Sequence, residues 1–215
     1  MTTAIVIAGT DTDIGKTVFA AALTAALNGC YWKPVQAGLA GETDSGAVAR
    51  LGPVPKDRIV PEVYRLKTPA SPHFAAEQYG LAIDSAALKI PTVSAPLIIE
   101  LAGGLAVPLT RHLLQIDVVA TWKLPVVLCA ATRLGTINHS LLSIEALKRR
   151  AIPILGVAFM GEANTDSERT ICEMGAVKRL GRLPRLDPLN ADTLQRAFDA
   201  YFRVADILGV GASGP

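Results

Sequence analysis

An α/β fold, in which a mostly parallel sheet carries helices on both faces, is the class that this sequence predicts. Short apolar runs alternate along the chain with helical patterns and turn residues, which is typical of strand–helix–strand units. The first apolar run, AIVIA, leads directly into the glycine-bearing loop GTDTDIGKT. The chain has 215 residues, of which 50% are hydrophobic, and this is enough for a sizeable core. We therefore expect residues 1–215 to form a single domain.

The strands of this sheet are predicted where short apolar runs are bounded by turn residues. They are expected at residues 4–8, 31–35, 97–101, 126–130 and 154–159, with a weaker candidate at 178–183. The carboxyl ends of parallel strands meet at one edge of a sheet, where ligands of this fold class bind. Polar residues that follow these runs are therefore candidates for one shared site.

Helices are expected at residues 16–28, 138–150 and 191–208, where apolar residues recur at helical spacing. Residues 36–96 are less regular and rich in proline, with short helices expected near 44–52 and 73–80. Ordinary connections have only about 4 to 6 residues. The long insertion is therefore predicted to have a function of its own.

Composition narrows the possible partners. The formal net charge is only +2, and the lysines and arginines are dispersed, which argues against nucleic-acid binding. Cys30, Cys129 and Cys172 lack the spacing of a zinc site or a disulfide framework, which fits a reducing cytoplasm. No apolar run approaches the ~18 residues that a membrane span needs. A cytoplasmic protein without a membrane partner is expected.

The loop GTDTDIGKT is interpreted as a phosphate site, although the standard pattern G-x-x-x-x-G-K-[ST] would require glycine at Thr10 rather than at Gly9. A strand that passes through such a loop into a helix presents backbone N–H groups and a helix N-terminus to an anion. Lys16 would reach the β- and γ-phosphates of a nucleotide, and the Thr17 hydroxyl would coordinate Mg²⁺. The strand–loop–helix context favours this P-loop NTPase reading over a chance turn.

Three charged residues are expected beside this loop. Lys33 ends the second strand and would supply a second cation for a developing anion, although a lysine at a strand end can also simply reach solvent. Asp44 is interpreted as a carboxylate facing Mg²⁺, as the N-cap of the helix that follows, or as both. Glu100 ends an apolar strand, where an unpaired carboxylate would be costly to bury, and this favours a role facing the metal.

Two further segments, TPASPHFAAE and LGTINHS, have the residue types of helix starts. Ser71 with Pro72 fits a cap followed by a first-turn proline, and Asn138 fits a cap. Capping alone would explain these residues, so their types by themselves assign no ligand.

The ordered set GTDTDIGKT, WKPVQAG, ETDS, SPHFAAE, ELAGG and LGTINHSLL resembles the dethiobiotin synthetase family over residues 4–186. The spacing between Gly9 and Gly15 is the spacing of that family. The resemblance implies a homodimer of α/β P-loop subunits. It also implies the conversion of 7,8-diaminopelargonate, CO₂ and ATP, with Mg²⁺, to dethiobiotin, ADP and phosphate.

The resemblance further implies the residues of the site. Nucleotide contacts are implied for Asp13, Ile14, Gly15, Lys16, Thr17, Val18, Asp44, Glu100, Leu101, Ala102, Gly103, Leu183, Pro184 and Arg185. Substrate contacts are implied for Thr12, Lys33, Ala37, Ser71, Pro72, and for Gly135 and Asn138 of the neighbouring subunit. Mg²⁺ would lie among Thr17, Asp44 and Glu100, and the catalytic residues would be Lys33, Lys16 and Thr12.

The chain departs from the family pattern at two positions. Ala37 stands where a hydroxyl residue is common, and Leu101 stands in a turn usually built from smaller residues, which it is expected to narrow. Asn164 is the nearest candidate for a purine-contacting asparagine. Two alternatives remain open: an amidoligase-like synthetase that acts on another carboxylate, and a partition-type ATPase switch. Thr10 argues against the switch, because partition ATPases have lysine there.

Overall fold

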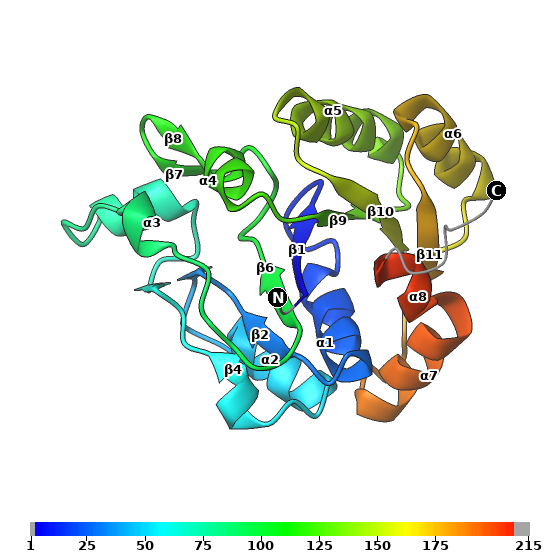
Figure 1. Cartoon of the computed structure of the whole chain (residues 1–215), viewed down its shortest axis with the longest axis horizontal. Coiled ribbons are helices and arrows are strands. Elements are labelled where there is room, and N and C mark those ends of the chain that lie inside the picture. Colours follow the sequence, from blue (N-terminus) through cyan, green and yellow to red (C-terminus); the bar gives the residue numbers. More distant parts are fainter. Residues whose placement is uncertain (1–2, 209–215) are drawn as a thin grey trace.

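A parallel sheet forms the centre of the computed structural model, which describes residues 3–208; residues 1–2 and 209–215 of the predicted domain lie outside that range. The sheet has seven strands in the order β11-β10-β9-β1-β6-β2-β4, and each neighbouring pair is parallel. The strands are β1 Ala4–Gly9, β2 Cys30–Trp32, β4 Ile59–Val60, β6 Leu97–Glu100, β9 Val126–Ala131, β10 Ile154–Met160 and β11 Arg179–Leu183. The predicted α/β class is confirmed (Figure 1).

The second strand is shorter than predicted, because it ends at Trp32 rather than at residue 35. Pro34 has no N–H to donate to the sheet, and its carbonyl instead accepts from the backbone of Val63 and Tyr64. The chain then forms β3 Val35–Ala37, which pairs in parallel with β5 Tyr64–Leu66 in a separate two-stranded sheet. Lys33 therefore lies in the short connection between β2 and β3 and belongs to neither strand.

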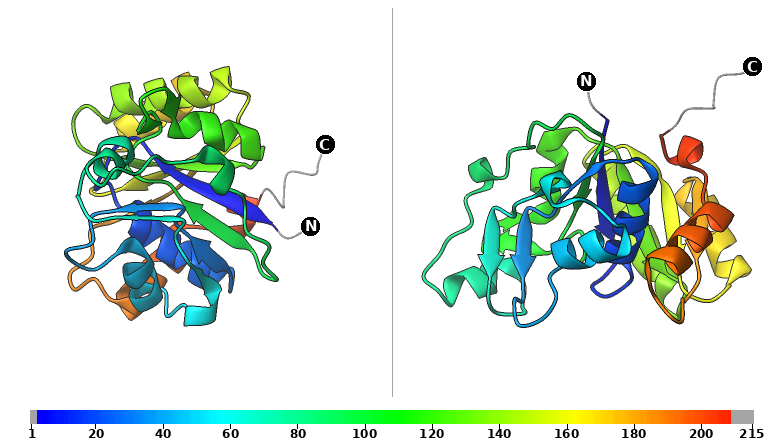
Figure 2. Two further views of the ribbon diagram at one scale, coloured as in Figure 1. Left: turned by 90° about the vertical axis from the view of Figure 1, so that its left-hand side faces the viewer. Right: turned by 90° about the horizontal axis from the view of Figure 1, so that it is seen from below.

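Helices cover both faces of the sheet, as Figure 2 shows. Alternate residues of β1 point to opposite faces, so that Ile5 and Ile7 enter one core while Val6 and Ala8 enter the other. The first core includes residues of α1 Lys16–Ala26, α2 Asp44–Leu51, α7 Ala191–Tyr201 and α8 Val204–Leu208. The second includes residues of α4 Gln115–Trp122, α5 Thr136–Arg149 and α6 Thr165–Gly175. The predicted covering of both faces is confirmed.

Several helix predictions need correction. The helix expected at 191–208 is two helices, because Phe202 adopts extended backbone angles and buries its ring against Phe19 and Phe198. The helix expected from Asn138 begins at Thr136, after Gly135 in a left-handed conformation, so Asn138 lies inside the helix and is not its cap. Helices α4 and α6 were not predicted at all.

The long connection, which is the insertion at residues 36–96, contains both short helices that were expected within it. These are α2 and α3 Pro72–Glu77. It also contains β3, β4, β5 and two 3₁₀ turns, Lys56–Arg58 and Ser85–Ala87. This segment has a small core of its own, in which residues of β3, β5 and α3 meet residues of α4 and of β7 Pro108–Thr110, which pairs with β8 Leu113–Leu114. This core includes Ala75 and Ala76 of α3, whereas α2 packs in the first core through Val48 and Leu51. No helix within residues 3–208 has the length and apolarity to cross a membrane.

Candidate active site

The phosphate loop runs from the end of β1 at Gly9 to the start of α1 at Lys16. A Cβ atom at position 9 would lie 2.8 Å from Cδ of Lys16, so only glycine lets the lysine side chain fold over the loop. Gly15 has a φ of 97°, a left-handed conformation that suits glycine. The glycine that departs from the standard spacing therefore has a structural reason. Lys16 Nζ donates to the carbonyl of Asp11 at 2.8 Å.

Three oxygen-bearing side chains converge beside this loop. Thr17 Oγ1 lies 2.7 Å from Oδ1 of Asp44 and 2.7 Å from Oε1 of Glu100. Thr17 comes from α1, Asp44 from α2 and Glu100 from the end of β6. Two carboxylates and a hydroxyl are hard oxygen donors of the kind that Mg²⁺ prefers. The residues predicted to face the metal are thus brought together, and their chemistry fits that ion.

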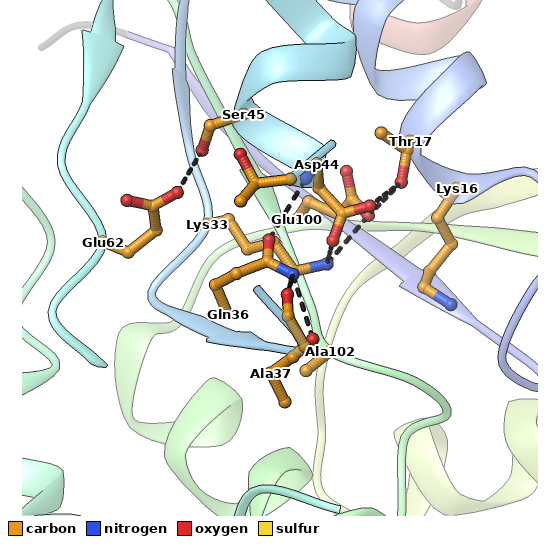
Figure 3. Close-up of polar contacts among 12 residues, drawn as sticks. Lys16, Thr17, Lys33, Gln36, Ala37, Asp44, Ser45, Glu62, Glu100 and Ala102 are labelled. Carbon is orange, nitrogen blue, oxygen red and sulfur yellow. Dashed lines mark hydrogen bonds and ion pairs between the residues drawn. The ribbon is translucent and has the colours of Figure 1, made fainter. Parts of the chain in front are cut away.

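Lys33 pairs with both carboxylates of this cluster (Figure 3). Its Nζ lies 2.6 Å from Oδ2 of Asp44 and 3.1 Å from Oε1 of Glu100, and the lysine is only 5% exposed. Burial by itself would lower the pKa of Lys33, but the charges of Glu100 and Asp44 outweigh it and raise the pKa above its ordinary value. The lysine is therefore a buried cation paired with two carboxylates rather than a side chain reaching for solvent.

The other lysine of the site behaves differently. Lys16 is 6% exposed, and burial lowers its pKa, with Glu100 opposing the shift and Lys33 adding to it. Lys16 makes its hydrogen bond to Asp11 rather than to the carboxylates, but both lysines line the same cavity as Asp44 and Glu100. An anionic group that enters the cavity would therefore lie close to both lysines.

The first turn of α2 shows why Asp44 is free to serve the site. The N-cap is Thr43, whose side chain accepts from the backbone N–H of Gly46, so the interpretation of Asp44 as the cap was wrong. Gln36 Oε1 accepts from the backbone N–H of Asp44, and Ser45 donates to Glu62 at 2.6 Å. These contacts, visible in Figure 3, position the Asp44 carboxylate toward Lys33 and Thr17.

Sequence analysis missed two residues that support the cluster. Gln36 is 5% exposed and also donates through Nε2 to the carbonyls of Ala37 and Gly38. Tyr31, in β2, is fully buried and donates its hydroxyl to Oε2 of Glu100 at 2.8 Å. Burial, followed by the Glu100 charge, raises the pKa of Tyr31 well above its ordinary value. Both residues sit in runs dominated by apolar neighbours, and nothing local in the sequence reveals their distant partners.

A cavity of about 740 Å³ opens over the phosphate loop and the cluster. The predicted site residues that line it are Thr12, Asp13, Gly15, Lys16, Thr17, Val18, Lys33, Ala37, Asp44, Ser71, Pro72, Glu100, Ala102 and Gly103. Ser71 is the N-cap residue of α3, although its side chain makes no capping hydrogen bond. The phosphate loop, the long connection and the end of β6 are far apart in the sequence, but they line the same cavity.

The remaining predicted residues lie elsewhere. The side chains of Ile14 and Leu101 are 5% and 2% exposed, and each packs in one of the two cores. Leu183 ends β11 and is followed by Pro184 and Arg185, outside the cavity lining. Gly135 and Asn138 are exposed at the start of α5, also outside it. Asn164 is the N-cap of α6 and accepts from the backbone of Ser167.

A parallel sheet whose first strand leads through a glycine loop into a Gly-Lys-Thr helix start defines the P-loop nucleotide-binding class. Two solved structures share this fold. A ParA-family ATPase from Chlorobium tepidum has a TM-score of 0.53 at 11% identity, covering 99% of this chain and 93% of its own. The MinC:MinD cell-division complex from Aquifex aeolicus has a TM-score of 0.53 at 14% identity, covering 99% and 97%. These similarities concern the fold alone.

The family follows from closer relatives. A family model described as an AAA domain matches residues 3–193. An ATP-dependent dethiobiotin synthetase from Rhodopseudomonas palustris is 63% identical over 97% of this chain and 99% of its own. Enzymes of the same name from a Bradyrhizobium species and from Nitrobacter hamburgensis are 64% and 58% identical, over 94% and 97% of this chain and 97% and 98% of their own. The chain belongs to the dethiobiotin synthetase family.

Proposed function

We propose that this protein is an ATP-dependent ligase of biotin biosynthesis. It converts 7,8-diaminopelargonate, CO₂ and ATP to dethiobiotin, ADP and phosphate. The observation that carries the proposal is the cluster in which Lys33 bridges Asp44 and Glu100 beside Thr17, at the floor of a cavity that the phosphate loop also lines. The high identity to synthetases over nearly the full length supports it.

The reaction divides into three steps. An uncharged amine of the substrate attacks CO₂, forming a carbamate and releasing a proton. A carbamate oxygen then attacks the γ-phosphorus of ATP, breaking the bond to the bridging oxygen of ADP and forming a carbamic-phosphoric anhydride. The second amine attacks the carbonyl carbon, displaces phosphate and closes the ureido ring. Each step creates or moves negative charge, so preorganised cations should supply most of the catalysis.

The lysines and the loop provide that preorganisation. Lys16 would hold the β- and γ-phosphates, and Lys33 would meet the carbamate and the phosphoryl group in transfer. Thr12, on the exposed part of the loop beside the cavity, would orient the reacting end of the diamine. Thr17, Asp44 and Glu100 would hold Mg²⁺, which neutralises phosphate charge when bound. No residue of the protein becomes a nucleophile in this mechanism.

The substrate and the base of the nucleotide would lie at opposite ends of the site. Ala37, Ser71 and Pro72 line the cavity on the side of the long connection and would contact the diamine. Because Ala37 has no hydroxyl, one hydrogen bond to the substrate would be either absent or made by a backbone group instead. Glu100 and the turn from Leu101 to Gly103 would approach both the nucleotide and the diamine. Because the side chains of Leu101 and of Ile14 in the phosphate loop are buried, these two residues would contact a ligand through their backbone alone. Leu183, Pro184 and Arg185 would line the purine.

The proposal extends to the assembly of the protein. The start of α5, at Gly135 and Asn138, is exposed and outside the cavity, so it would receive the distal carboxylate of a substrate bound to the neighbouring subunit. The protein would thus be a homodimer with shared sites. Residues 1–215 would act as one cytoplasmic synthetase domain, in which the insertion 36–96 supplies Asp44 and the substrate side.

Isotope transfer tests the chemistry itself, because a nucleotide switch would also release ADP and phosphate. In the proposed mechanism the attacking oxygen comes from CO₂ and stays on phosphate when the ring closes. Turnover with freshly dissolved ¹⁸O-labelled CO₂, faster than exchange with water, should place one label in the released phosphate. Label that arrives from ¹⁸O-water instead, with turnover independent of the diamine, would show hydrolysis and overturn the synthetase assignment.

A further inference from the structure

Glu100 has its two carboxylate oxygens assigned to different partners. Oε1 accepts from Thr17 and from Lys33, and so faces the cavity cluster. Oε2 accepts from the hydroxyl of Tyr31 on the neighbouring strand, at 2.8 Å. We propose that Tyr31 is a positioning residue that fixes the orientation of Glu100, so that Oε1 is presented to the metal and to Lys33. The inference rests on the proposed function, and Tyr31 itself touches no substrate.

The register of the sheet brings Tyr31 close to Glu100. Strands β2 and β6 pair in parallel with Tyr31 beside Ile98. Because side chains alternate between faces, Glu100 shares the face of Ile98 and lies one diagonal step from Tyr31. A tyrosine side chain is long enough to cover such a diagonal distance. The donor therefore comes from the rigid centre of the fold rather than from a loop.

Both partners of this hydrogen bond are buried, which raises the cost of losing it. Tyr31 is 0% exposed and Glu100 is 1% exposed, so water cannot replace the phenol hydroxyl as a donor to Oε2. Without that donor, the carboxylate is less restrained about its last torsion, and neither oxygen is held firmly toward Thr17 and Lys33. Phenylalanine would keep the ring and its packing in the core while removing only the hydroxyl. The substitution Tyr31→Phe thus isolates the orienting bond.

The test measures metal binding as well as turnover, using the full chain. Calorimetric titration of Mg²⁺ into the ADP complex should show an affinity about 10-fold weaker for Tyr31→Phe, on the scale of losing an outer-shell partner. At saturating substrates, kcat should fall by about 10-fold while the KM for the diamine changes little, since the substrate contacts remain. Affinity for ADP without Mg²⁺ should be unchanged.

Two further variants keep the result interpretable. Tyr64→Phe removes a phenol whose oxygen accepts from the backbone of Asp84, away from the cluster, and should leave Mg²⁺ affinity and kcat unchanged. Tyr31→Leu removes ring and hydroxyl together. If Tyr31→Phe matches the wild type while Tyr31→Leu fails, the tyrosine serves packing alone and the proposal is wrong.

The metal titration also separates this proposal from the proposed function. It needs ADP and Mg²⁺ but neither diamine nor CO₂. A wild-type protein that makes no dethiobiotin, combined with weakened Mg²⁺ binding in Tyr31→Phe, would overturn the function and uphold the role of Tyr31. Unchanged Mg²⁺ affinity in a folded Tyr31→Phe variant would overturn the role of Tyr31 whatever the reaction.

Discussion

Lys33, which directly follows β2, and Asp44, the first residue of α2, form an ion pair of 2.6 Å. The lysine side chain is 6% exposed and the aspartate side chain 30%, so the pair bridges the interior of the protein and the cavity. Its cation faces the place where the proposed reaction develops negative charge.

Lys33→Gln should retain ATP binding and lose most turnover, because the residue meets the transferring group while Lys16 and the loop hold the nucleotide. Calorimetry with ATP and a steady-state assay measure the two effects. Lys89→Gln, at an exposed position, is the control and should change neither. Loss of ATP affinity with normal turnover at saturation would instead make Lys33 a nucleotide-holding residue.

Thr17→Val should fold normally and lose Mg²⁺-dependent turnover by at least ~100-fold, the scale of removing one preorganised electrostatic element. The matched control is Thr24→Val in the same helix, where the hydroxyl donates to the carbonyl of Ala20. It should keep its activity. Near-normal turnover in a folded Thr17→Val variant would remove Thr17 from the metal site.

Asp44→Asn and Thr43→Ala should divide activity from stability. Thr43 is the cap of α2, so Thr43→Ala should lower the free energy of unfolding by about 1 kcal/mol while most activity remains. Asp44→Asn keeps that cap and should weaken Mg²⁺-dependent turnover severely. Chemical denaturation and an activity assay on both variants check this division. The reverse pattern would return Asp44 to a capping role.

Mixed subunits should reveal whether the substrate site is shared. Lys33→Gln and Asn138→Glu should each be inactive, the second because a carboxylate at the start of α5 repels the carboxylate of the substrate. In a hybrid dimer one of the two sites keeps both Lys33 and Asn138. Because random exchange also re-forms the two inactive parental dimers, it should restore roughly a quarter of the wild-type activity. If exchange is demonstrated by mass spectrometry and no activity returns, the site lies within one subunit.

Sequence reasoning located the chemistry of the site better than its scaffold. Thr17, Lys33 and Glu100 follow or end apolar runs, and the rule that parallel strands end at one edge was enough to bring them together. Asp44 was ambiguous because Thr43, Asp44 and Ser45 are all good caps, and only the tertiary contacts decide among them. Tyr31 and Gln36 were missed because their importance depends on partners that local patterns do not reveal.

The longer strands of the central sheet and helices α1, α5 and α7 were predicted from periodicity, whereas α6 was missed although it has 11 residues. The short strands β4, β5, β7 and β8 have two or three residues, too few for an alternating pattern to emerge. The break at Phe202 inside an apparently continuous helical pattern is imposed by core packing against Phe19 and Phe198, which overrides local propensity. Helix breaks of this kind are determined by tertiary packing and not by the local sequence.

The cluster also joins points that are far apart along the chain, and this bears on the order of folding. Thr17 is 27 residues from Asp44 and 83 from Glu100, and the latter contact depends on β1 pairing with β6 from Ala4 and Leu97 onward. Helices form in about a microsecond, whereas long-range parallel pairing is slow. In refolding, helical circular dichroism should therefore recover first, and Mg²⁺-dependent nucleotide binding should return only when the central strands have paired.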